Sequence, residues 1–429
     1  MFQVFRNAWK IEELRKKILF TLFIVLLYRI GNAVPVPYID RTLLQNYFSS
    51  LQNTVLGLYN MMSGNAFSTA TIFALGIQPY INSSIIIQLL CVAIPALERL
   101  SKDGGEEGRR KINSITRYAT VAIGLIMGTA YYLLIRNQGL LAANGHSFWA
   151  AIVIIMTFVG GAALLMWLGE QITEFGIGNG ISMILFASIV SRLPSAVYNL
   201  IKNMIAGSLS VVAFIGIIIG VAIIVILIVF VSDAERRIPV QYAKRVVGRR
   251  MYGGQSTYLP MKVNMSGVMP IIFAQSIASL PATIASFCRA PKAGSFGEKF
   301  LNFIDTDGIP YMIIYFLLII AFGYFYATIQ FNPIEVSNNL KKNGGYIPGF
   351  RPGRPTSEFI SKVLNRITLF GSLYLGVVAA LPIAFSGITK TGGVSLGGTS
   401  IIIAVGVAIE IVQALENQML MRHYKGFLD

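Results

Sequence analysis

Long apolar stretches alternate along this chain with shorter polar segments. A helix rises about 1.5 Å per residue, so about 20 apolar residues cross a hydrocarbon core of roughly 30 Å. We therefore expect an all-α polytopic membrane protein. The pattern predicts ten transmembrane helices, near residues 18–36, 76–97, 115–135, 148–168, 180–200, 209–231, 267–288, 310–331, 367–386 and 399–419.

Ten predicted spans divide into two halves of five, at 1–207 and 208–429. Because each half has an odd number of spans, the second half would be inverted in the membrane relative to the first. Many transport proteins use such inverted halves and place their functional site at the interface between them. The count therefore permits two inverted five-helix halves.

The segment 57–75 does not fit this alternation. It is only moderately apolar and rich in small and hydroxyl residues, which favours a re-entrant or interfacial element over a crossing. Irregular backbone at membrane depth persists only where protein buries it or where it lines a water-filled cavity. A helix lying on the outer surface is the alternative.

Composition supports the membrane assignment. Apolar residues make up 55% of the chain and charged residues 13%, and the mean hydropathy is +0.65. So few charges cannot cover the surface of a water-soluble protein of this size. The basic start leads straight into the first predicted span without a small-residue cleavage site, so we expect no cleavable signal peptide.

The net charge of +16 is unevenly distributed. With the N-terminus placed in the cytosol, 26 of the 35 Lys and Arg residues lie in cytosolic segments and 9 lie elsewhere. Basic residues are retained on the cytosolic side of membrane proteins. We therefore expect both termini to be cytosolic.

Two predicted cytosolic loops, 232–264 and 332–366, are much longer than the others. Both carry Lys and Arg together with Gly and Pro turn signals, so each is expected to be a projecting hairpin or finger. Orientation alone needs only a few basic residues beside each helix. The loops suggest docking of an acidic partner or RNA, with solvated charge as the alternative.

Residues that could catalyse a reaction are scarce. The two histidines, His146 and His423, both lie outside the predicted spans, and there is no HExxH motif, which disfavours a membrane protease. Cys91 and Cys288 lie in apolar runs without metal-ligand spacing. The GIGNG sequence at 176–180 follows no predicted strand and is interpreted as a tight turn entering a helix. We expect no enzyme activity, no cofactor and no metal site.

A secondary transporter is the main alternative, because such proteins often have inverted repeats. Transporters usually carry ionisable groups deep in their spans, where each charge costs roughly 2.5–3.5 kcal/mol. Here Glu410 is the clear interior candidate, and a structural helix–helix contact would explain it equally well. The spans are instead rich in isoleucine, which suits a hydrophobic constriction better than an ion pathway.

Five stretches resemble signature sequences of the SecY family of protein-translocation channels. They are GIQPYINSSIIIQLL (76–90), GIGNGISMILFASIV (176–190), the run from RRIPVQYAKR to MPIIFAQSI (236–277), FNPIEVSNNLKKNGGYIPGFRPG (331–353) and GGTSIII (397–403). They occur in order from the second predicted span to the last, and five long matches in register are specific.

The resemblance implies an hourglass-shaped channel of two five-helix halves with a ring of aliphatic side chains at its waist. The implied ring positions are Ile81, Ile85, Ile181, Leu185, Ile272 and Ile403. It also implies a plug near 57–75 that blocks the outer funnel. The implied plug positions are Asn60, Met61, Met62, Ser63, Gly64, Asn65, Ala66 and Phe67.

A lateral gate between the second and third spans and the seventh and eighth is implied too, with Gln88 and Asn179 as candidate polar contacts. Through it, transmembrane segments would reach the membrane lipids. The basic loops would dock the SecA ATPase or a ribosome, through its rRNA and exit-site proteins. The implied docking residues are Arg236, Arg237, Lys244, Arg245, Arg249, Arg250, Lys341, Lys342, Arg351 and Arg354.

As a member of that family, the chain would be the central pore-forming subunit of the channel in the cell inner membrane. It would associate with the small subunits SecE and SecG. Unfolded secretory preproteins would cross through its pore, and nascent membrane proteins would leave it sideways into lipid. SecA or the ribosome would supply the driving force.

Overall fold

The computed structural model describes residues 2–50, 55–102, 104–207, 210–242, 245–247, 250–252, 256–265, 267–287, 308–389 and 398–425. The elements described in the first half of the chain are all helices. Its helices are α1 (Phe2–Lys10), α2 (Glu12–Gly31), α3 (Arg41–Ser50), α4 (Val55–Met62), α5 (Gln78–Ala93), α6 (Pro95–Lys102), α7 (Gly105–Asn137), α8 (Phe148–Phe175), α9 (Gly180–Val190) and α10 (Leu193–Ile205).

The second half adds short strands to its helices. Its helices are α11 (Val211–Ser232), α12 (Met269–Phe287), α14 (Ile309–Gln330), α15 (Pro333–Lys342), α16 (Arg354–Thr389) and α17 (Gly398–Lys425). Its strands are β1 (Glu235–Tyr242), β2 (Arg245–Val247), β3 (Arg250–Tyr252), β4 (Ser256–Lys262) and β5 (Gly345–Tyr346).

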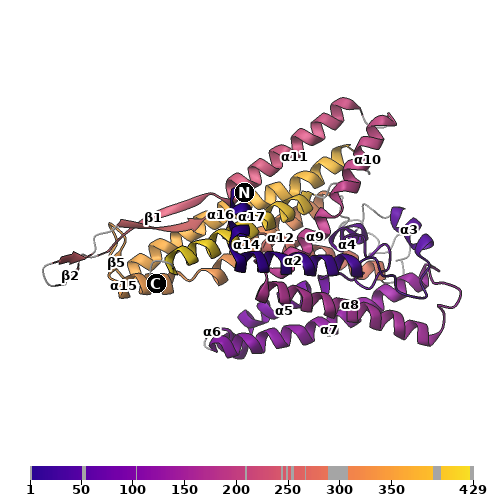
Figure 1. Ribbon diagram of the computed structural model, residues 1–429, viewed down its shortest axis with the longest axis horizontal. Helices are drawn as coiled ribbons and strands as arrows, with labels where there is room; N and C mark the ends of the chain where they lie inside the picture. The colour runs from indigo at the N-terminus through magenta and orange to yellow at the C-terminus, as the bar shows by residue number, and fades with distance from the viewer. Residues whose placement is uncertain are drawn as a thin grey trace.

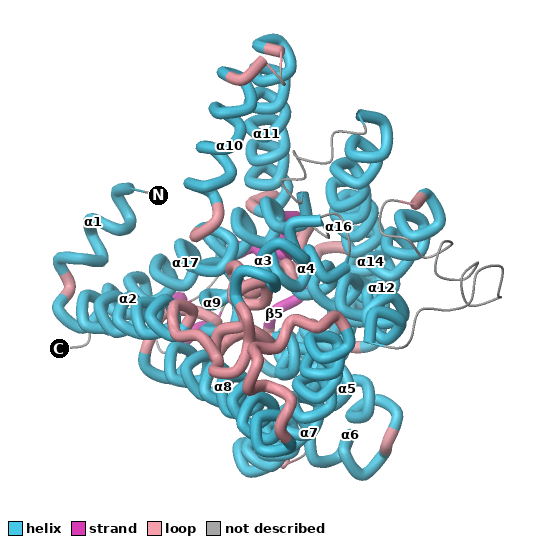
Figure 2. The backbone as a smooth tube through the Cα atoms, turned by 90° about the vertical axis from the view of Figure 1, so that its right-hand side faces the viewer, coloured by secondary structure: helices cyan, strands magenta, loops and turns pink. Residues whose placement is uncertain are grey.

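The helices form a bundle, and the strands project from one end of it (Figure 1). Seen from the opposite end, α3 and α4 lie over the middle of the bundle, with α5, α7 and α8 on one side and α12, α14 and α16 on another (Figure 2). The helices α10 and α11 extend away from the rest. The strands and the bundle centre are therefore at different levels along the long axis.

Seven helices among the described residues are long and apolar enough to cross a membrane, or eight if the bent pair α5 and α6 forms one span. The first predicted span corresponds to α2, which begins with the charged run 12–17. The seventh corresponds to α12, which contains Pro281. A polytopic helical membrane protein is confirmed, whereas the number ten, the inverted halves and the orientation stay predictions.

The predicted span 76–97 is not one continuous helix. The helix α5 ends at Ala93, and α6 leaves at an angle of 106° to it. Between them, Ile94 has an extended backbone (φ −107°, ψ 113°). A residue that precedes proline is pushed out of the helical region by the proline ring, and Pro95 follows Ile94 directly. Pro95 therefore divides the predicted span into two helices.

Strands β1 and β4 form an antiparallel ladder from the pair Glu235 and Lys262 to the pair Gln241 and Ser256. Beyond the ladder, β2 pairs with β3, so the expectation of a hairpin for 232–264 is confirmed. The loop 332–366 is different: it contains α15, adds β5 to the edge of β1 and continues into α16. This second loop does not form a hairpin of its own, but it packs on β1 and projects from the bundle together with the strands (Figure 1).

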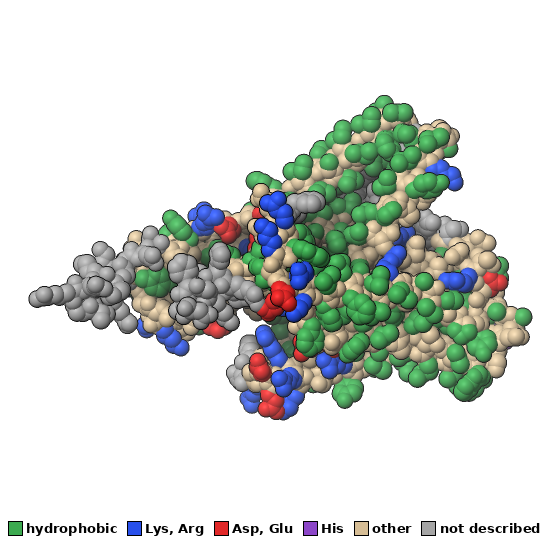
Figure 3. All heavy atoms as spheres, in the orientation of Figure 1, with side chains coloured by type: hydrophobic (Ala, Val, Ile, Leu, Met, Phe, Trp, Pro, Cys, Tyr) green, Lys and Arg blue, Asp and Glu red, His purple; other side chains and the backbone are tan. Residues whose placement is uncertain are grey.

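A separate hydrophobic cluster joins this sheet to α15 and α16. Its buried members are Ile238, Val240, Met261, Ile347, Ile360 and Leu364. Alternate residues of β1 therefore face this cluster while its arginines face solvent. On the face shown in Figure 3, most charged side chains lie in the half nearer the strands, whereas hydrophobic side chains predominate over the rest of the bundle.

Candidate functional site: the central aliphatic cluster and its surroundings

The residues expected at the waist come together in one hydrophobic cluster, although they lie far apart in the sequence. Five of them are buried, with side chains only 1–3% exposed: Ile81, Ile85, Leu185, Ile272 and Ile403. The sixth, Ile181, is partly exposed and packs against the same cluster. The cluster thus receives side chains from α5, α9, α12 and α17.

Helical geometry explains how each element contributes to this cluster. Ile81 and Ile85 are four residues apart on α5, and so are Ile181 and Leu185 on α9, so each pair lies on one helix face. The neighbouring Ile86 points away and is 47% exposed. Aliphatic side chains offer no hydrogen bond to water or to a peptide backbone. The cluster can therefore exclude water while remaining deformable.

The segment 57–75 is packed inside the bundle instead of lying on its surface. Ala66, Phe67, Phe73 and Leu75 are all at most 3% exposed. Met62, at the end of α4, belongs to the central cluster together with Ala66. The structure therefore agrees with a buried element that lies beside the aliphatic cluster.

Further interactions stabilise the middle of this segment. Phe67 stacks on Tyr131 of α7 with ring centroids 4.2 Å apart, and the Tyr131 hydroxyl donates to the Phe67 carbonyl oxygen. A Cβ atom on Gly161 of α8 would lie 1.9 Å from the carbonyl oxygen of Ile72. Glycine is thus required where α8 meets the segment. The segment is therefore packed closely against both α7 and α8.

Other expected plug positions form internal hydrogen bonds. The Asn60 side chain accepts from the Ser68 amide at 2.9 Å and donates to Asn65 at 3.2 Å. Gly64 and Asn65 have positive φ angles of 64° and 75°, which asparagine and glycine tolerate best. For Met61 the structure describes the backbone, within α4.

Two residues that the sequence analysis did not identify tie this segment to the bundle. The Tyr28 hydroxyl of α2 lies 3.1 Å from the Ser63 carbonyl oxygen and 2.6 Å from the Ser188 Oγ of α9. All three residues are buried. Hydroxyl groups inside apolar spans commonly join helices, and this was the available signal for Tyr28 and Ser188.

Gln88 lies at the boundary between the two groups of helices. It donates a hydrogen bond to Ser84 on its own helix at 3.0 Å, and its side chain lies close to that of Tyr326 on α14. Helices α5 and α7 also contact α12 here. Gln88 is therefore placed where a lateral gate was expected.

Asn179 has a local role in the structure. Its side-chain oxygen accepts hydrogen bonds from the amides of Ile181 at 3.0 Å and Ser182 at 3.3 Å, which caps the N-terminus of α9. Gly178 before it has φ +70°, so the tight turn expected for GIGNG is confirmed. The role expected for Asn179 at the lateral gate stays a prediction.

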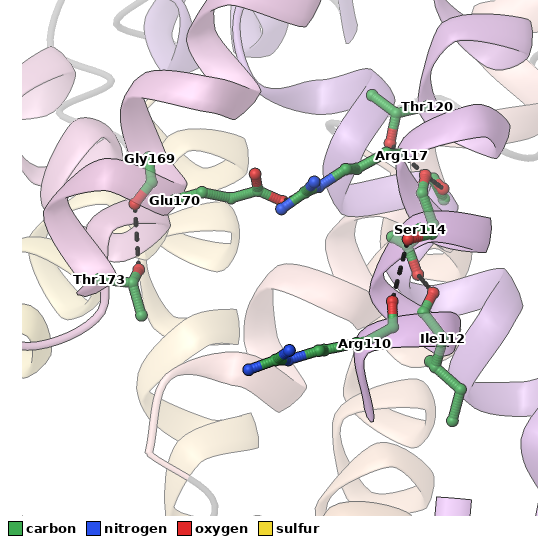
Figure 4. Close-up of polar contacts among 10 residues, drawn as sticks. Arg110, Ile112, Ser114, Arg117, Thr120, Gly169, Glu170 and Thr173 are labelled. Atoms are coloured by element: carbon green, nitrogen blue, oxygen red, sulfur yellow. Dashed lines mark hydrogen bonds and ion pairs between the residues drawn. The ribbon is translucent and has the colours of Figure 1, made fainter. Parts of the chain in front are cut away.

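A pocket of about 290 Å³ opens beside Asn179. Its lining is polar apart from Ile181, which connects it to the aliphatic cluster: Tyr80, Asn113, Arg117, Glu170, Thr173, Glu174, Asn179 and Ile181. Arg117 of α7 and Glu170 of α8 point toward one another, with Nε and Oε1 2.9 Å apart (Figure 4). The pocket therefore joins a charged rim to the cluster.

The described docking residues are at the strand-bearing end. Arg236 and Arg237 are exposed on β1, where Arg237 pairs with Glu235 at 2.6 Å. The backbones of Arg245 and Arg250 lie in the β2–β3 hairpin. Lys244 and Arg249 lie outside the described residues.

The other docking residues surround the turn after α15. Lys341 and Lys342 are exposed in the last turn of α15, and Arg354 pairs with Glu358 at 2.9 Å. Thr356 donates to the Arg351 carbonyl oxygen at 2.8 Å, and Ser337 donates to the Gly353 carbonyl oxygen, also at 2.8 Å. These bonds stabilise the turn while the Arg351 side chain remains exposed.

Comparison with known proteins identifies close relatives along the whole chain. The SecY family model matches residues 71–412. The chain is 46% identical to the protein translocase subunit SecY of Streptomyces scabiei and 43% identical to that of Mycobacterium bovis, in each case over 100% of both chains.

The fold also matches solved structures of low sequence identity. One, described as the structure of a protein conducting channel, has a TM-score of 0.65 at 17% identity and covers 94% of this chain and 92% of its own. Another, described as showing that the SecY plug domain stabilises the closed channel, has a TM-score of 0.67 at 18% identity with the same coverage. Canine Sec61 in a ribosome–channel complex gives a TM-score of 0.63 at 17% identity, covering 94% and 92%.

Proposed function

The chain belongs to the SecY family of protein translocase subunits, and we propose that the central aliphatic cluster is the constriction through which it conducts polypeptides. The observation that carries this proposal is the convergence of Ile81, Ile85, Leu185, Ile272 and Ile403 from four helices into one buried cluster. An unfolded chain could pass such a constriction without being held by hydrogen bonds. Between substrates, the same side chains would limit the passage of ions.

The segment 57–75 would act as the plug. Its contacts with Tyr28 and Tyr131 amount together to two hydrogen bonds and one aromatic stack, so an entering polypeptide could displace it. The boundary containing Gln88 and Tyr326 would serve as the lateral gate, through which membrane segments enter lipid.

The exposed basic residues on β1 and around Arg351 would bind the partners that drive transport, the SecA ATPase and the ribosome. The canine relative is described in a ribosome–channel complex, which supports this proposal. Arginine pairs with carboxylates and with phosphates, so one surface could serve both partners. The small subunits SecE and SecG would complete the channel.

The proposed location is the cell inner membrane, with the strand-bearing end and both termini in the cytosol. The structure places α1 against α17, so the first and last helices are neighbours, and the strands adjoin α17 through Lys262 and Gln413. We expect the chain itself to catalyse no reaction, so that ATP or GTP hydrolysis occurs in its partners.

The test of this function uses sealed proteoliposomes that contain the chain with SecE and SecG. SecA, ATP and an unfolded secretory precursor are added outside, and protection of the precursor from protease is measured. We expect ATP-dependent protection that an Arg351→Glu substitution abolishes. The matched control Lys362→Glu reverses a charge on α16 away from the turn and should retain protection. Absence of protection in the unaltered protein, where a known channel succeeds, would refute the assignment.

A further inference from the structure

Glu410 is a half-buried acidic residue in the middle of α17 that the proposed pore, plug, gate and docking surface do not use. Its carboxylate lies against the turn at Gly267 and beside the backbone amide of Val268, directly before the first residue of α12. The first amides of a helix have no partner within the helix, and the partial positive charge there favours an anion. Glu410 therefore supplies α12 with an acceptor from another helix.

Two glycines bring the turn before α12 into contact with α17. Gly267 has a φ of +61°, and a Cβ atom there would lie 2.6 Å from the Glu410 Oε1. Gly406 lies one helical turn before Glu410, and a Cβ atom on it would lie 2.3 Å from Val268 Cγ1. Any side chain at either position would separate the two elements, so this contact depends on close backbone approach.

The same turn of α17 is connected to the base of the docking strands. Lys262, the last residue of β4, donates to Gln413 Oε1 at 2.5 Å, and Gln413 donates to Asp233 Oδ1 at 3.4 Å. Lys262 also lies close enough to Glu410 for a favourable charge interaction. The amide of Val263 donates to the Ala234 carbonyl oxygen at 2.9 Å, which joins the ends of both strands.

The contact between Glu410 and the turn before α12 also adjoins the aliphatic cluster, along both helices. The amide of Ile272 donates to the Val268 carbonyl oxygen at 3.3 Å, within the first turn of α12. Ile403 precedes Glu410 by seven residues on α17, which places both on one face of the helix. The two helices that Glu410 joins thus each carry one of the residues expected at the waist, Ile272 on α12 and Ile403 on α17.

We propose that Glu410 is a positioning residue that fixes the first turn of α12 to α17, so that a partner bound to the docking strands displaces Ile272. This inference deepens the proposed function and rests on it. A rigid turn with hydrogen bonds on both sides can transmit a displacement that a loose loop would absorb. Without the carboxylate, the strands could move while α12 stays in place.

The test measures partner binding and the response at the pore separately. Cys91 and Cys288 are replaced by serine, Ile272 is replaced by cysteine, and this cysteine carries an environment-sensitive fluorophore. The chain is reconstituted with SecE and SecG, and SecA is titrated without precursor. We expect Glu410→Gln to leave the Kd for SecA unchanged while the fluorescence response falls about fivefold or more, the lower end of typical coupling between sites.

Glu416→Gln is the matched control, because it makes the same chemical change at an exposed position of α17. Glu410→Asp keeps the negative charge and should restore part of the response. Gly267→Ala, which would displace the Glu410 carboxylate, should reproduce the loss and gives a second test if Glu410→Gln does not fold.

Equal responses of Glu410→Gln and Glu416→Gln would overturn the inference, and so would weakened SecA binding by Glu410→Gln, because the residue would then maintain the docking surface. Failure of the proposed function is recognised separately. In that case the unaltered protein transports no precursor, whatever the fluorophore reports.

Discussion

The hydroxyl oxygen of Tyr28 lies 2.6 Å from the Oγ of Ser188, and both side chains are buried beside the proposed plug. Tyr28 also lies 3.1 Å from the carbonyl oxygen of Ser63, the first residue after α4. One hydroxyl group therefore joins α2, α9 and the segment that covers the aliphatic cluster. A polar contact therefore holds the proposed plug in addition to its apolar packing.

Tyr28→Phe removes this hydroxyl and keeps the ring that stacks on Phe73. Ser188 can still donate to the Ile184 carbonyl oxygen at 2.8 Å, so it keeps a partner. The loss of about 1 kcal/mol should raise ion leakage through the resting channel about fivefold. The leakage is measured as conductance across planar bilayers without substrate. Tyr118→Phe is the control, because Tyr118 lies 79% exposed on α7. Equal leakage in both variants would show that the Tyr28 hydroxyl does not hold the proposed plug in place.

A photoreactive amino acid at position 85 tests the constriction directly. Ile85 is 3% exposed within the cluster, whereas its neighbour Ile86 is 47% exposed on the other side of α5. With a precursor arrested during transport, we expect adducts to the precursor at position 85 and adducts to lipid at position 86. Adducts to the precursor in equal yield at both positions would show that substrate does not pass through the cluster.

The side chains of Gln88 and Tyr326 lie close together across the boundary between α5 and α14, and we expect a hydrogen bond between them to oppose opening there. Tyr326→Phe removes it at a cost of about 0.5–1.5 kcal/mol, so lateral release should become about 2–10-fold faster. The measurement is crosslinking of a translocating transmembrane segment to lipid over time.

Gln88→Leu provides the second side of a double-mutant cycle for this pair. If the two side chains act through one bond, the double variant should resemble Tyr326→Phe alone. Additive acceleration would show that the bond does not form in the closed channel.

The ion pair between Arg117 and Glu170 should add little stability. Its side chains are 53% and 23% exposed, and pairs in water contribute about 0.2–1 kcal/mol. Arg117→Gln should therefore lower the Tm by about 2 °C or less. Lys111→Gln, which breaks the exposed pair with Glu107 on the same helix, should behave alike in the same thermal unfolding assay. A much larger decrease for Arg117→Gln would indicate that the pocket needs this pair to fold.

The sequence by itself determined the features that depend on local chemistry. The apolar stretches predicted most of the long helices, because burying apolar residues in lipid requires backbone hydrogen bonds within each segment. The four-residue spacings placed Ile81 with Ile85, and Ile181 with Leu185, on single helix faces. The positive-φ turn at Gly178 and the hairpin beginning at β1 follow from neighbouring residues alone.

Tertiary structure decided which of these faces meet. Nothing local to α2 requires Tyr28 to contact Ser188, and nothing local to α17 requires Glu410 to cap α12, because these partners are separated by more than a hundred residues. The loop 332–366 was expected to form a hairpin or finger of its own, yet it folds into α15 and β5 and packs against β1. Contacts between distant segments depend on the complementary shapes of packed helices, and a single sequence does not display those shapes.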